Sequence, residues 1–119
     1  MTTDKQKICK CGVNVAEFLG DTRTLEIYVR ATNAGNFATN TSAFKSYVNT
    51  MARDINKIED VCGIDADNMK RINTGILDKL EEMESIKDLK QFDEKKEYIF
   101  RDLDKITYDM VLRVKECSK

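Results

Sequence analysis

The sequence predicts an all-α protein, a small antiparallel helical bundle in which three long helices follow a shorter N-terminal element. Three observations predict this fold. After residue 41, apolar residues recur at steps of three and four, the spacing of one helix face. The 119 residues contain no proline, so no residue forces a helix to end. Hydrophobic residues make up 41% and charged residues 34% of the chain, a balance typical of folded amphipathic helices.

The N-terminal third gives conflicting signals. We expect residues 1–20 to form a cysteine-bearing segment packed on the bundle, and residues 21–119 to form a single helical-bundle domain. Over residues 24–32, alternating apolar and polar side chains favour a strand, whereas Leu25, Tyr28, Val29 and Thr32 also share a helix face. We predict a helix, because a lone strand would have no partner for its backbone groups. Residues 33–41, rich in Asn, Thr, Gly and Ala, are expected to form a mobile loop.

The clearest helix is predicted over Ser42 to Cys62. Thr41 or Ser42 can cap its start, and Gly63 stands where a left-handed C-terminal cap would lie. Its apolar residues form a heptad seam: Phe44, Val48, Met51, Ile55, Ile58 and Cys62.

The next helix is predicted to begin after Asp65 or Asp67, either of which can cap it, and to end near Ile86. Gly75 lies inside this helix at a cost of roughly 1 kcal/mol relative to alanine. The apolar face of this helix consists of Met69, Ile72, Ile76, Leu80 and Met83.

The last helix is predicted over Asp88 to Cys117. If continuous, it would be about 45 Å long and would overhang its neighbours. The charged run over residues 93–97 interrupts the apolar face, so we expect a solvated face there, with a bend or an exposed start. The apolar residues of this helix are Leu89, Phe92, Ile99, Leu103, Ile106, Met110 and Val114. Short connections between the predicted helices favour antiparallel neighbours.

In this topology Cys9, Cys11, Cys62 and Cys117 all lie toward one end of the bundle. Four cysteine thiolates can hold a tetrahedral zinc ion or an iron–sulfur cluster, and a glycine after two of them lets backbone amides approach the sulfur. Two other interpretations stay open. Free cysteines often behave as small buried hydrophobes, and two cysteines can form a disulfide or carry redox chemistry.

One short motif suggests the cluster. Residues 9–15, Cys-Lys-Cys-Gly-Val-Asn-Val, resemble the Cys-x-Cys-Gly-x-Asn-Ile stretch near the start of the large iron–sulfur flavoprotein subunit of heterodisulfide reductases. The resemblance covers seven residues and implies cysteine ligands to a cluster. The flavin domain and the ferredoxin-type cysteine runs of that family have no counterpart in this chain.

Composition restricts the function classes. Without histidine, the Ser-His and Cys-His nucleophile pairs and His-bearing zinc sites are excluded, so we expect no enzyme. A formal net charge of −1 with interspersed signs makes nucleic-acid binding unlikely. No apolar run approaches the ~20 residues that span a bilayer, and the polar start has no signal-peptide core. We therefore expect a cytoplasmic protein with reduced thiols and no membrane contact.

Two functional hypotheses follow. The first is a non-enzymatic helical protein–protein interaction protein, such as an adaptor, small inhibitor or assembly subunit, that binds a protein partner or self-associates, with or without a four-cysteine metal site as a clamp. The second is a cysteine-ligated iron–sulfur or redox protein for electron transfer or sensing.

Overall fold

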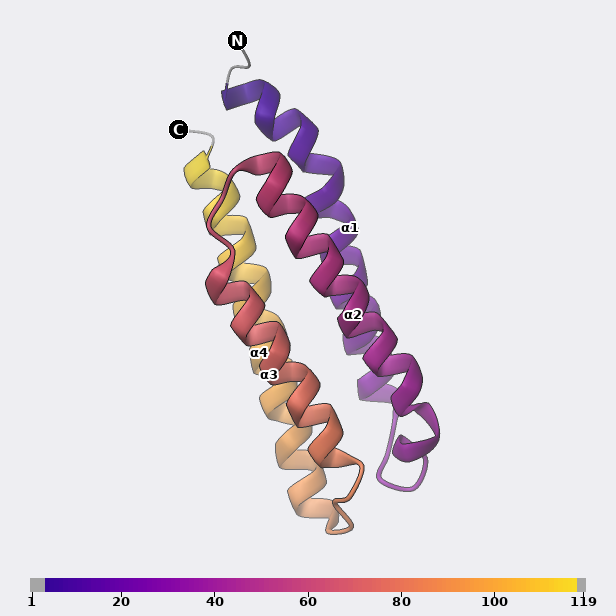
Figure 1. Cartoon of the computed structure of the whole chain (residues 1–119). Coiled ribbons are helices and arrows are strands. Elements are labelled where there is room, and N and C mark those ends of the chain that lie inside the picture. The colour runs from indigo at the N-terminus through magenta and orange to yellow at the C-terminus, as the bar shows by residue number, and fades with distance from the viewer. Residues whose placement is uncertain (1–3, 118–119) are drawn as a thin grey trace.

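The protein is a four-helix bundle in the part of the chain that the structure describes. The computed structural model describes the backbone of residues 4–117 and the side chains of residues 11–115. The helices are α1 (Asp4–Ala31), α2 (Phe37–Cys62), α3 (Asp67–Met83) and α4 (Leu89–Cys117), and no strand occurs in the described backbone. Successive helices run in opposite directions (Figure 1). The predicted all-α helical bundle is therefore confirmed.

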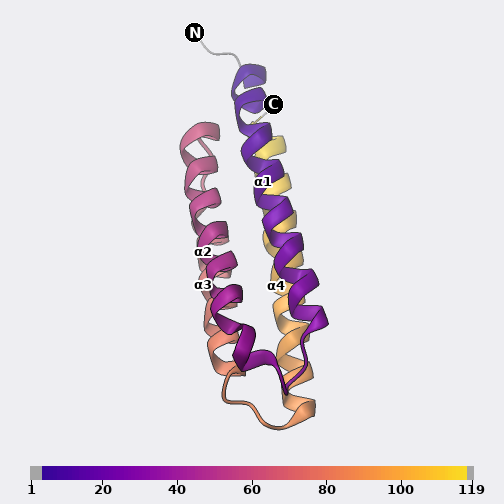
Figure 2. The same cartoon turned by 90° about the vertical axis from the view of Figure 1, so that its right-hand side faces the viewer.

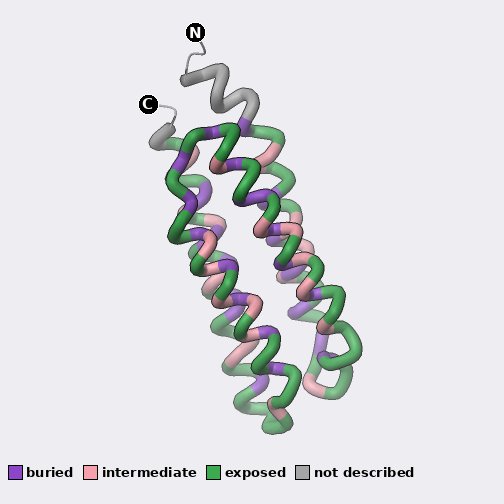
Figure 3. The backbone as a smooth tube through the Cα atoms, in the orientation of Figure 1, coloured by how far each residue is buried: buried purple, intermediate pink, exposed green. Residues whose placement is uncertain are grey.

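Each helix packs mainly against two others, so the four form a square in cross-section. α1 contacts α2 and α4, and α3 contacts the same two helices on the opposite corner. A view turned by 90° shows α1 beside α4 and α2 beside α3 (Figure 2). The bundle is long and thin, with extents of 56 × 19 × 18 Å. Buried residues recur along the helices on the sides that face the other helices (Figure 3).

α1 differs most from the sequence prediction. It is one uninterrupted helix of 28 residues, so the expected shorter N-terminal element is wrong. The prediction of a helix over residues 24–32 is confirmed, and the proposed boundary at residue 20 falls inside α1. The inner face of α1 is a heptad seam of Cys11, Val15, Phe18, Thr22, Leu25 and Val29, and Thr32 continues this spacing just past the end of the helix. Buried Thr22 and Thr32 donate their hydroxyls to the carbonyls of Phe18 (2.8 Å) and Tyr28 (2.6 Å), which satisfies two polar groups within the helix.

The connection between α1 and α2 is shorter than predicted. It covers only residues 32–36, and α2 begins at Phe37. Asn33 and Asn36 close this turn: Oδ1 of Asn33 accepts the N–H of Asn36 (3.1 Å), and Oδ1 of Asn36 accepts the N–H of Asn33 (2.9 Å). Thr41 and Ser42 lie inside α2, so neither of them caps the start of this helix as predicted. The helix starts early because the buried Phe37 ring packs against Phe44 and Phe92.

The turn between α2 and α3 follows the prediction at its first residue. Gly63 has a positive φ of 67°, and its N–H donates to the Glu59 carbonyl at 3.0 Å, so it is the predicted left-handed cap. α3 begins at Asp67 with Ala66 as its N-cap residue, and it ends at Met83, before the predicted Ile86. The Asp65 carboxylate accepts the N–H of Asp67 at 3.0 Å and so still supports the start of α3.

α4 is continuous over 29 residues, so the predicted bend in residues 93–97 does not occur. The charged run stays helical because it is anchored outside α4. Lys95 pairs with Glu82 of α3 at 2.8 Å. The Lys96 ammonium donates to the carbonyl of Thr32 at 2.6 Å, just past the C-terminus of α1, where the helix dipole favours a cation. α4 is longer than α3, but α1 lies along it, which reduces the predicted overhang.

The core runs the length of the bundle and contains nearly all the predicted apolar positions. All six seam residues of α2 are buried. The predicted apolar face of α3 is buried as well, except for Ile72, which is half-buried. On α4, Leu89 is 68% exposed and is a wrong core prediction. The most buried side chains include Phe18, Leu25, Met51, Ile55, Ile58, Met69, Ile76, Leu80, Phe92 and Ile99. Among residues 4–117, no helix is long and apolar enough to cross a membrane.

Candidate functional site

The cysteine-bearing helix ends gather at one end of the bundle. α1 begins there, and α2 and α4 end there (Figure 1). This helix order places the backbones of Cys9, Cys11, Cys62 and Cys117 toward that end. The helix directions determine at which end of the bundle each cysteine backbone lies, but not which cysteine side chains are in contact.

Cys11 and Cys62 form a disulfide that joins α1 to α2. Their Cα atoms are 5.5 Å apart, a usual separation for a disulfide, and both residues are about 1% exposed. Each cysteine occupies a seam position of its helix, so the packing of the two seams brings the sulfur atoms together. The structure therefore differs from the expected reduced thiols at this pair.

The structure describes the side chains of only two of the four predicted metal ligands, Cys11 and Cys62. The side chains of Cys9 and Cys117 lie outside the described residues. Within those residues, no group of three or more Cys, Asp or Glu side chains is placed to hold a metal ion. A sulfur atom in a disulfide carries no thiolate charge, so Cys11 and Cys62 are not metal ligands in this form.

An exposed apolar face occupies the final third of α4. Tyr108 is 70% exposed, and Val111 and Leu112 are 36% and 40% exposed. Their spacing of three and four residues places them on one side of the helix. Sequence reasoning assigned the inner face of α4 to the core but did not single out these outer residues. One tyrosine and two aliphatic side chains therefore stand exposed to solvent on this side of α4.

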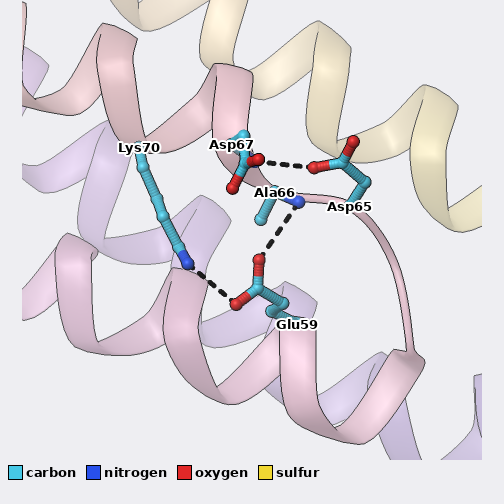
Figure 4. Close-up of polar contacts among 5 residues, drawn as sticks. All are labelled: Glu59, Asp65, Ala66, Asp67 and Lys70. Carbon is cyan, nitrogen blue, oxygen red and sulfur yellow. Dashed lines mark hydrogen bonds and ion pairs between the residues drawn. The ribbon is translucent and has the colours of Figure 1, made fainter.

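A polar clamp fixes the turn that follows the disulfide. The Glu59 carboxylate of α2 accepts the N–H of Ala66 at 3.3 Å and the Lys70 ammonium of α3 at 2.8 Å (Figure 4). The Lys70 hydrogen bond lowers the pKa of Glu59, and the same bond raises the pKa of Lys70. The sequence analysis did not single out Glu59, because a bond to a residue eleven positions away leaves no local pattern.

The Glu59→Gln variant is expected to unfold at a slightly lower temperature than the wild type at pH 7. Because the folded protein holds the pKa of Glu59 below its ordinary value of 4.5, the carboxylate stabilises the fold above that pH. The stabilisation is lost as the pH falls through the lowered folded-state pKa. Circular dichroism melts at pH 7 and pH 3 should therefore show a difference that shrinks in acid. The exposed Glu94→Gln variant is the control, and an equal decrease in that variant would contradict the clamp.

One acidic side chain of α2 is buried. Asp54 of α2 is only 9% exposed, and its Oδ2 atom has no hydrogen-bond donor in the protein. Burial raises the pKa of Asp54 to about 7, and a hydrogen bond to the Asp21 carboxyl of α1, together with the charges of Asp21 and Glu17, adds to this increase. Lys57 opposes it. The sequence analysis did not single out Asp54, since an acidic residue in a helix usually faces water.

The geometry combines a disulfide-linked helix pair, a clamped turn and an exposed apolar face near one end of a bundle. No protein-family model, curated protein or solved structure matches the chain.

Proposed function

We propose that this chain is a non-enzymatic helical interaction protein, such as an adaptor, small inhibitor or assembly subunit, that binds a protein partner or a second copy through the outer face of α4. The observation that supports the proposal most is the apolar face of Tyr108, Val111 and Leu112. Burying such side chains is favourable by about 25 cal/mol per Å² of apolar surface. The disulfide and the Glu59 clamp support the role because each ties α2 to a neighbouring helix, and a stiffer bundle lowers the entropy cost of binding.

The composition also supports a role without catalysis. The chain has no histidine to serve as a general base near neutral pH. Several acidic side chains are engaged in ion pairs between helices: Glu59 with Lys70, Glu84 with Lys45, Glu82 with Lys95, and Asp102 with Lys79. These four acidic side chains therefore have structural partners within the bundle.

The Tyr108→Lys/Leu112→Lys double variant is expected to lose at least about tenfold of its partner binding or self-association, because it replaces the centre of the apolar face with two charges. Size-exclusion chromatography with light scattering measures self-association. Affinity capture from native lysate, compared between the wild type and the variant, measures partner binding.

The control is Tyr98→Lys, which removes another exposed tyrosine nearer the other end of α4. It should behave as the wild type in both measurements. A strict monomer that captures the same proteins as the double variant would contradict the proposed function.

A second candidate remains a cysteine-ligated zinc or iron–sulfur protein, supported by the shared end of the three cysteine-bearing helices. In that form all four cysteines would be thiolates, and the Cys11–Cys62 disulfide would be open. A cytoplasmic location belongs with this reduced form, whereas the disulfide is typical of an oxidising compartment. Elemental analysis of anaerobically purified protein tests it: fewer than about 0.2 metal atoms per chain contradicts a tetrahedral site.

A further inference from the structure

A hollow lies between α1 and α4 on the outside of the bundle, where the two helices run side by side (Figure 2). Its volume is about 410 Å³. α1 contributes Leu19, Gly20 and Arg23 to its lining, and α4 contributes Asp104 and Thr107. A Cβ atom added to Gly20 would meet no other atom within 4 Å, so the hollow is open at the place where most residues would carry a side chain.

The apolar face of α4 continues this hollow toward the cysteine-bearing end of the bundle. Tyr108 lies four residues after Asp104, and Val111 lies four residues after Thr107. Residues at this spacing are neighbours on one side of a helix, so the apolar face begins one turn beyond the α4 wall of the hollow. We call the hollow and the apolar face together the α1–α4 groove.

Positive side chains flank the α1–α4 groove. Lys105 lies one turn before the apolar face, and Lys115 lies one turn after it, both exposed. Arg101 is exposed one turn before Lys105, and Arg23 of α1 lines the hollow. The groove therefore has positive charge at both ends and on both of its helices.

The described acidic side chains near the groove are fewer or have partners. Asp104 lines the hollow. Glu26 also lines it but pairs with Arg30 at 3.0 Å, and Asp109 of α4 pairs with Arg113 at 3.6 Å. Two further acidic residues of α1 lie on its other side, where Tyr28 stacks against α2: Glu17 and Asp21. The charges around the groove are therefore complementary to an acidic ligand.

We propose that the α1–α4 groove binds an acidic amphipathic helix of a partner protein, which packs its apolar side on the apolar face of α4 and inserts a side chain into the hollow beside Gly20. This inference rests on the proposed function and names the chemistry of the partner. Arg101 and Lys115 are 14 residues apart, so the site is about 21 Å long and accommodates about four turns of helix. A second copy fits less well, because pairing this stretch of α4 with itself would bring like charges together.

The probe is a displayed library of helical peptides of about 15 residues, long enough to cover the groove. Leucine is fixed along one helical face, and each remaining position is Glu, Gln or Lys. Selection against the oxidised full-length protein should retain sequences in which Glu outnumbers Lys by at least about threefold. Their binding should weaken as the salt concentration rises, because the charges involved are exposed to solvent.

Two variants locate the site on the protein. Gly20→Leu fills the hollow and should weaken binding of the retained peptides by at least about tenfold. Because Gly20 is exposed within a helix, this substitution should not lower the urea midpoint. Gly75→Leu is the matched control, since it adds the same side chain to open space on α3 and should bind the peptides as the wild type does. Arg101→Glu/Lys105→Glu should reverse the selection, so that sequences rich in Lys are retained.

Three results would overturn the inference: retained sequences with as much Lys as Glu, equal binding by the wild type and Gly20→Leu, or no retained sequence. Tighter binding of a labelled single-stranded oligonucleotide than of the selected peptides would also overturn it, since nucleic acid would then be the better ligand. The proposed function has its own test in Tyr108→Lys/Leu112→Lys. It survives a failure of the peptides if that variant loses partner capture or self-association.

Discussion

A Cys11→Ala/Cys62→Ala variant is expected to lose about 4 kcal/mol of unfolding free energy relative to the oxidised wild type. The two cysteines are 51 residues apart, and closing a loop of this length removes chain entropy from the unfolded state by about that amount. Alanine is chosen because both side chains are buried, and serine would add the cost of a buried hydroxyl. Urea denaturation without reductant measures the loss.

Two controls distinguish the disulfide from the loss of side-chain volume. Adding dithiothreitol to the wild type should bring its urea midpoint close to that of the double alanine variant, and reductant should leave the variant unchanged. A Cys9→Ala/Cys117→Ala variant keeps the Cys11–Cys62 pair and should retain the response to reductant. A wild type with the same midpoint in the presence and absence of reductant would contradict the link.

Phe37→Ala is expected to cost about 3–5 kcal/mol, although Phe37 lies in a stretch whose composition favours a loop. Its side chain is 1% exposed, and its ring centroid lies 5.5 Å from Phe44 and 5.3 Å from Phe92, the latter edge-on. The variant leaves a cavity where α2 begins and removes a contact between α2 and α4.

Thr39→Ala is the matched control, because this residue is exposed two positions away in the same helix turn. Its stability should change by less than about 0.5 kcal/mol, as for other exposed positions. Urea denaturation of the three proteins gives both values. Equal, small effects of Phe37→Ala and Thr39→Ala would show that α2 begins later than Phe37.

Helices α2, α3 and α4 were predictable because apolar side chains dominate their inner faces. In α2, steps of three and four from Phe44 to Cys62 predicted the buried seam, and Gly63 marked its end. The continuity of α4 was not predictable, because Lys95 and Lys96 gain their partners from α3 and from the end of α1. Such contacts between distant residues leave no local signal.

The N-terminal part of the α1 seam was missed because two of its positions, Cys11 and Thr22, do not look apolar. Cys11, Thr22 and Thr32 lie at the correct heptad spacing, but two of them bury hydroxyl groups that bond to the preceding turn. A search that counts threonine and cysteine as compatible with a helix core would have extended this helix toward the N-terminus. The burial of Asp54 had even less signal, since its place in the sequence resembles that of any exposed acidic residue in a helix.

The cysteines show what chain direction can and cannot predict. Alternating helix directions placed all four toward one end, and the structure has this helix order. Which pair forms a bond depends on the faces: Cys11 and Cys62 both continue buried seams, so they meet between α1 and α2. The choice between a disulfide-linked interaction protein and a four-thiolate metal centre therefore depends on the state of one pair.

Tryptic peptide mapping of protein alkylated during cell lysis tests that state most directly. Because a lysine or arginine separates every pair of cysteines, trypsin places each in its own peptide: Ile8–Lys10, Cys11–Arg23, Ile58–Lys70 and Glu116–Lys119. If the chain is a disulfide-linked interaction protein, we expect the second and third peptides to be recovered joined to each other, and this joined species should disappear on reduction. Recovery of all four peptides singly, each with an alkylated cysteine, would contradict the disulfide and favour the thiolate form.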